Sequence, residues 1–81
     1  MAPRLRSLSG RDVVKALGTL GFEVVSIRGS HVKLRRESAG GGPQILTLPL
    51  HKQMAPGTLR AIYRQASRFV AEDDLRSLSY R

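Results

Sequence analysis

The chain has no cysteine and no tryptophan among its 81 residues, and it has only two phenylalanines and two tyrosines. The absence of cysteine excludes disulfides, thiolate metal ligands and a thiol nucleophile. The scarcity of aromatic side chains argues against recognition of single-stranded nucleic acid by base stacking. We expect the four aromatic residues to contribute mainly to the core, and any chemistry to come from other side chains.

Long apolar runs are also missing. The longest spans only a few residues, far short of a membrane crossing, and the first ten residues lack the apolar centre of a secretory signal. A chain of this length supports one small domain with a thin core. We therefore expect a single domain over residues 1–81, with its core at about 8–67 and an extension over 68–81. We expect it to have no membrane contact and a cytoplasmic location.

Acidic residues are few. Six Asp and Glu face fourteen Lys and Arg, which gives a net charge of +8, and three of the six acids are consecutive at residues 72–74. A small domain with this excess of positive charge attracts polyanions through counterion release and long-range steering. The composition therefore favours a nucleic acid, an anionic membrane surface or an acidic protein as partner over a basic surface without a ligand.

Hydrophobic periodicity predicts two main helices and three strands. A Ser9–Asp12 capping pattern precedes the first helix, and Pro56 suits the first turn of the second. The runs between them are rich in β-branched residues or alternate between apolar and polar residues, as strands do. The predicted helices are residues 10–20, a helix that begins at Pro56, and a short C-terminal helix over about 72–79; the predicted strands are 22–28, 31–36 and 44–48.

This α-β-β-β-α order predicts an α+β fold, in which a three-stranded antiparallel sheet has both main helices on one face. Alternation places His31, Lys33 and Arg35 together on the opposite face of the sheet. We expect function there. The apolar residues expected to face the helices are Val25, Ile27, Val32, Leu34, Leu46 and Leu48.

Gly29 and Ser30 have the length and composition of a two-residue hairpin turn with glycine leading. This turn would set His31 at the start of the following strand. From the residues alone, His31 is either a group that acts on a bound phosphate or a polar residue of a surface strand. Ser30 has no acidic partner or oxyanion motif, so its role in the turn is favoured over that of a nucleophile.

Four short segments occur in a fixed order along the chain: Leu20-Gly21-Phe22, Gly29-Ser30-His31, Leu48-Pro49-Leu50-His51 and residues 56–62, Pro-Gly-Thr-Leu-Arg-Ala-Ile. Together they resemble the HicA, or YcfA-like, family of toxins in type II toxin–antitoxin systems. The resemblance covers about residues 8–67 and implies a fold like that of double-stranded-RNA-binding domains. It further implies an endoribonuclease that cuts messenger RNA without a metal ion or other cofactor, and a HicB-type antitoxin that covers its active site.

The resemblance makes His31 the catalytic residue. Metal-free RNA cleavage needs a base for the 2′-hydroxyl proton, an acid for the departing 5′-oxygen and cations around the phosphorane. His51 is a second proton-transfer group, a phosphate contact or a plain loop residue. Two histidines and scattered carboxylates give no metal-ligand spacing. The expected RNA-binding cations are Arg28, Lys33, Arg35 and Lys52.

Two readings of the remaining basic residues stay open. Arg60 and Arg64 recur four residues apart on the second helix, where they form either a solvated face or a contact with RNA or antitoxin.

Two other functions stay open for the whole protein. One is a non-catalytic RNA- or DNA-binding module on the same fold, and the other is an inactive relative that binds only the antitoxin. We expect no DNA binding by the toxin alone.

Overall fold

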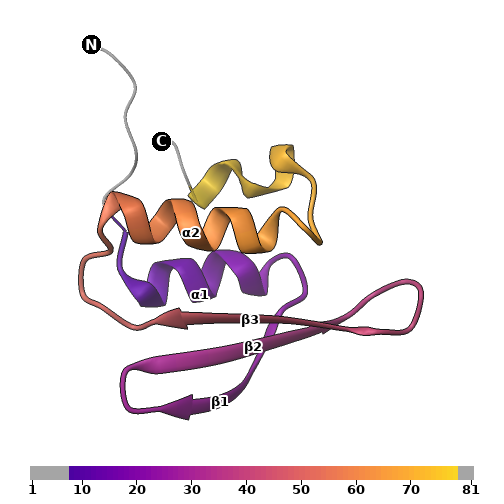
Figure 1. The fold of residues 1–81 in the computed structure, drawn as a ribbon, viewed down its shortest axis with the longest axis horizontal. Helices are drawn as coiled ribbons and strands as arrows, with labels where there is room; N and C mark the ends of the chain where they lie inside the picture. The colour runs from indigo at the N-terminus through magenta and orange to yellow at the C-terminus, as the bar shows by residue number, and fades with distance from the viewer. Residues whose placement is uncertain (1–7, 79–81) are drawn as a thin grey trace.

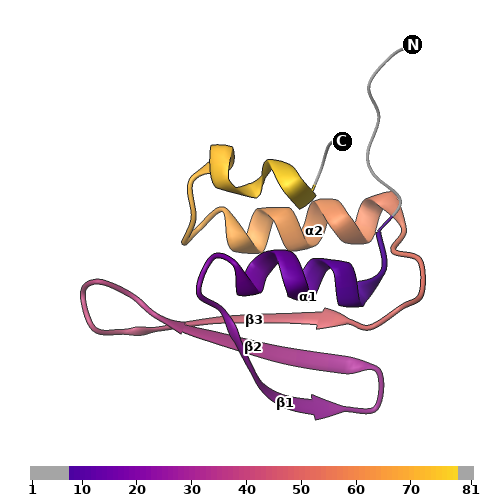
Figure 2. The same cartoon turned by 180° about the vertical axis from the view of Figure 1, so that it is seen from behind.

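The computed structural model describes residues 8–78, with side chains to residue 75 (Figure 1). The strands form one antiparallel sheet in the order β1-β2-β3, and the predicted α-β-β-β-α arrangement is confirmed. Seen from behind, both helices again lie on the side of the sheet where β3 runs, with α2 in contact with β3 and β1 farthest from the helices (Figure 2). The elements are α1 (Gly10–Gly18), β1 (Glu23–Arg28), β2 (His31–Glu37), β3 (Pro43–Pro49), α2 (Pro56–Ala66) and the 3-10 helix η1 (Glu72–Leu78).

The first helix begins at the predicted cap and ends earlier than predicted. The Ser9 hydroxyl accepts from the Asp12 amide at 3.1 Å, and the Asp12 carboxylate accepts from the Ser9 amide at 3.0 Å, which completes a capping box. The helix ends at Gly18 because the chain then turns toward the sheet. Gly21 has a φ of 98°, a conformation that glycine adopts without steric cost.

The other boundaries differ from the predictions by at most one residue. β3 includes a proline at each end, Pro43 and Pro49, which an edge strand tolerates because one side of its backbone needs no ladder partner. The acidic segment after residue 71 does form a helix, but of the tighter 3-10 type and over Glu72–Leu78. Residue 79, the predicted end, lies outside the described residues.

One apolar core fills the space between the helices and the inner face of β2 and β3. Val32 and Leu34 of β2 face it, and so do Leu46 and Leu48 of β3, all at most 1% exposed. The predicted burial of these four residues is confirmed. The helices and the segments before, between and after them contribute the other buried members, namely Leu8, Val13, Leu17, Phe22, Met54, Leu59, Ile62, Ala66, Val70 and Leu75.

The predicted burial of Val25 and Ile27 is wrong: these residues are 51% and 58% exposed. A β-bulge between Val24 and Ser26 adds an unpaired residue, Val25, to β1. Ile27 pairs with Val32 and so shares the inner face, but the helices lie toward β3 and leave β1 uncovered (Figure 1). The bulge and the position of the helices therefore both removed β1 from the core.

Candidate active site on the outer face of the sheet

The face of the sheet turned away from the helices, here called the outer face, is organised in rows across the strands. Residues paired across neighbouring strands share a face, with Cβ atoms about 4.5–5.5 Å apart. His31 pairs with Arg28 on one side and Pro49 on the other. The next row places Lys33 between Ser26 and Thr47. An imidazole and two cationic side chains thus meet at the end of the sheet that carries the β1–β2 turn.

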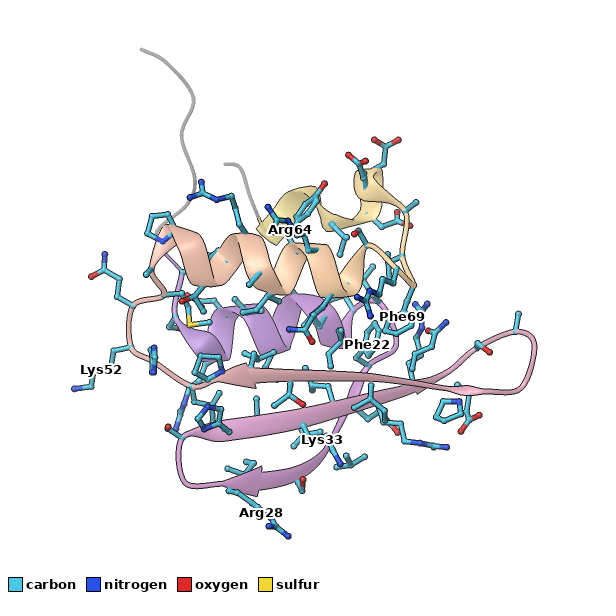
Figure 3. The ribbon with its side chains drawn as sticks, in the orientation of Figure 1. Phe22, Arg28, Lys33, Lys52, Arg64 and Phe69 are labelled. Carbon is cyan, nitrogen blue, oxygen red and sulfur yellow. The ribbon has the colours of Figure 1, made fainter. Side chains whose placement is uncertain are left out.

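An open recess of about 420 Å³ lies over these rows. This volume falls within the range of about 300–1,000 Å³ usual for small-ligand sites. Arg28 and Lys33 line it, and Figure 3 shows these two residues on neighbouring strands. The structure therefore brings together three predicted site residues and two small hydroxyl side chains; the lining is Ser26, Arg28, His31, Val32, Lys33 and Thr47.

The turn before His31 is built as predicted. Gly29 has a φ of 59°, and no described residue other than glycine has a positive φ, so Ser30 does not share this conformation. A glycine leading the turn with positive φ matches the primed turns that suit the twist of a hairpin. The Ser30 carbonyl accepts a hydrogen bond from the Leu50 amide, which ties the turn to the exit of β3. The backbone around His31 is thus held from both neighbouring strands.

His51 and Lys52 do not line the recess. Both are exposed and follow β3, and Lys52 points away from Arg28 and Lys33 (Figure 3). The His51 carbonyl accepts from the Gly10 amide at 2.7 Å, at the start of α1. A Cβ on Gly10 would lie 2.6 Å from the Leu50 Cα, so this close backbone contact requires glycine. The segment that carries His51 is therefore firmly placed beside the turn.

Arg35 differs from the other two outer-face cations. It pairs with Glu23 across the strands and forms an ion pair with Glu37 on its own strand. It is not part of the recess lining. Among the side chains of residues 8–75, acids therefore offset the outer-face charge at Arg35, and no ion pair joins Arg28 or Lys33 to an acid. Arg28 and Lys33 remain the cations beside His31.

Arg60 and Arg64 lie on the opposite side of the molecule from this recess. Both are exposed on α2, and Figure 3 shows Arg64 near η1, with the sheet residues Arg28 and Lys33 far below. With Arg68 they form a second cationic surface, separate from the recess.

Comparison with known protein families shows to which family the chain belongs. A model described as the HicA toxin of bacterial toxin–antitoxin systems matches residues 10–67. The chain belongs to the HicA toxin family. No curated protein and no solved structure matched it. As a HicA-family member it is the toxin of a toxin–antitoxin pair, which implies an antitoxin partner.

The HicA match ends before the last part of the core. Val70 and Leu75 are buried, and the Phe69 carbonyl accepts from the Arg36 guanidinium at 3.0 Å. The segment after residue 67, predicted to be an extension, therefore packs with the matched residues. No helix in the described residues 8–78 is long and apolar enough to cross a membrane, and these residues contain no group of three or more His, Asp or Glu placed to hold a metal ion.

Three residues of interest were not predicted. Ser26 and Thr47 line the recess because they pair with Lys33, and only the strand register reveals this. Arg36 faces the helices rather than solvent: it donates to Gln44 and to the Leu20 and Phe69 carbonyls, and its guanidinium lies 4.8 Å from the Phe22 ring centroid. Alternation with Val32 and Leu34 was the available signal for this inward orientation.

Proposed function

We propose that this toxin is an endoribonuclease that cuts messenger RNA without a metal ion, with the outer-face recess as its active site. The observation that carries the proposal is the placement of His31 opposite Arg28 and one row from Lys33, where all three line an open recess. Membership of a toxin family supports a destructive activity. Messenger RNA as substrate places the protein in the cytoplasm, and a HicB-type antitoxin is its proposed inhibitor.

The proposed reaction uses the 2′-hydroxyl of RNA as its own nucleophile. The 2′-oxygen forms a bond to phosphorus as its proton leaves, and the bond from phosphorus to the 5′-oxygen breaks as that oxygen takes up a proton. The products are a 2′,3′-cyclic phosphate and a 5′-hydroxyl. His31 carries out one of the two proton transfers, because imidazole both accepts and donates protons near neutral pH. Arg28 and Lys33 stabilise the negative charge of the phosphorane.

The test compares His31→Ala with His51→Ala, a matched change outside the recess. Purified proteins are incubated with RNA and with DNA of the same sequence, in the presence of a chelator. We expect RNA cleavage only, and a loss of about 10²–10⁴ in rate for His31→Ala, the usual contribution of a general acid or base. We expect His51→Ala to retain most of the activity. A His31→Ala protein that cuts RNA at the original rate would refute the assignment.

The alternative is a non-catalytic RNA-binding module, which the exposed cationic surface of α2 favours. Such a module would bind through Arg60 and Arg64 and would leave RNA intact at every enzyme concentration. The cleavage assay above separates the two functions. Cyclic phosphate ends on the products identify the 2′-hydroxyl mechanism, and intact RNA in a complex with the protein identifies the module.

A further inference from the structure

β1 is an open edge of the sheet. It pairs with β2 on one side, and no strand of the described residues 8–78 pairs with its other side. All six of its residues are exposed, and both views place it farthest from α2 (Figures 1 and 2). Unpaired backbone groups along such an edge are a template for another strand, and proteins usually protect them.

The apolar side chains of β1 are exposed next to this edge. Val24 and Ile27 pair with Leu34 and Val32, so they share the inner face with the core, yet they are 46% and 58% exposed. Three of the four large exposed hydrophobic residues in the described chain lie on β1. Exposed apolar surface gathered beside a free strand edge is typical of a protein-binding site.

β1 also borders the recess. Ser26 and Arg28 lie on its outer face and line the recess with His31. A strand added to the free edge of β1 would continue the sheet at a spacing of about 4.8 Å and place its own side chains beside Ser26 and Arg28. One added strand would therefore contact the apolar inner side of β1 and the cationic rim of the recess together.

We propose that the antitoxin of this toxin adds a β-strand to the free edge of β1, covers Val24 and Ile27 with apolar side chains, and presents a carboxylate to Arg28. The proposal rests on family membership, which implies an antitoxin, and not on ribonuclease activity. The positive charge of the chain favours the antitoxin, rather than a second copy of the chain, as the partner at this edge. Two chains of +8 repel each other, whereas an acidic partner is attracted.

The first test measures binding of the purified product of the reading frame adjacent to that of this chain. We expect Ile27→Asp and Val24→Asp each to weaken binding by about 30-fold or more, as truncation of central contacts in interfaces does. Ile45→Asp is the matched control, since Ile45 is exposed but lies on the outer face of β3, opposite Arg35. It should change affinity by less than about threefold. Circular dichroism confirms that each variant is folded.

The second test uses the unmodified proteins and hydrogen exchange. We expect the backbone amides of residues 23–28 that do not pair with β2 to exchange quickly in the free toxin and slowly in the complex. The proposal is overturned if protection appears on α2 without β1, if Ile45→Asp weakens binding as much as Ile27→Asp, if the two proteins do not bind, or if the free toxin is a dimer through β1. Neither of these two tests contains RNA. A toxin that binds its antitoxin through β1 but cuts no RNA in the separate cleavage assay would refute only the proposed ribonuclease.

Discussion

The two edge strands of the sheet, β1 and β3, have similar apolar side chains and different environments. Leu48 of β3 and Ile27 of β1 pair with the same residue, Val32, from opposite sides, and all three share the inner face. Leu48 is 1% exposed and Ile27 is 58% exposed. The difference arises because the helical layer lies against β2 and β3 and ends before β1 (Figure 1).

Because of this difference, one edge strand of the sheet contributes to the stability of the fold and the other is available for binding. β3 buries Leu46 and Leu48 in the core. A domain of 81 residues needs such burial because its surface is large relative to its volume. β1 keeps its apolar side chains in contact with water. The uncovered strand is therefore the part of the sheet that a partner can cover without disturbing the core.

The largest expected effect comes from truncating the two partners of Val32. Leu48→Ala should lower the free energy of unfolding by about 2–5 kcal/mol, because it removes buried methyl groups and leaves a cavity. Ile27→Ala should lower it by about 0.5 kcal/mol, since an exposed side chain loses little on truncation. Urea unfolding followed by circular dichroism measures both. Equal losses would mean that β1 is covered by the fold itself.

A smaller difference in unfolding free energy should be found between substitutions on the inner and outer faces of β2. Arg36→Met removes hydrogen bonds to Gln44 and to the Leu20 and Phe69 carbonyls, and we expect a loss of about 1–3 kcal/mol because these part-buried acceptors lose their donor. Arg35→Met breaks a surface ion pair with Glu37 and should cost less than about 1 kcal/mol. Thermal unfolding of the two variants compares them, and a costlier Arg35→Met would contradict the inward role of Arg36.

The smallest expected effect is a change in the salt dependence of RNA binding, and it distinguishes the outer face of the sheet from the cationic surface of α2. If the outer face holds RNA, Lys33→Ala should reduce the slope of log binding constant against log salt by about 0.7, the value for one phosphate contact with a single strand. Arg64→Ala on α2 should leave the slope unchanged. Fluorescence anisotropy with a labelled RNA oligonucleotide measures both slopes. A reduced slope for Arg64→Ala alone would move the RNA contact to the helical surface.

Much of the local structure follows from neighbouring residues. Ser9 and Asp12 cap α1, Gly29 leads the turn, and alternation puts His31 and Lys33 on one face; each of these predictions is confirmed. They were predictable because each depends on residues within a few positions along the chain. The RNA-binding and catalytic roles of these side chains stay predictions that the experiments above test.

Other features depended on contacts between distant segments. The bulge at Val25 interrupts the alternation of β1, and no residue type near it in the sequence indicates a bulge. Ser26 and Thr47 join the recess only because the register pairs them with Lys33. Val70 is buried in the core, although no predicted helix or strand includes it.

By itself, the sequence determined the order of the elements, the caps and turns that bound them, the basic charge and the face that carries His31, because these depend on local sterics and on composition. Only the tertiary structure decided which apolar side chains are buried, which outer-face cations form no ion pair within the described residues, and which strand is left open. Burial and pairing depend on where the helices pack and how the strands align, and these positions minimise the free energy of the whole chain rather than of any one segment.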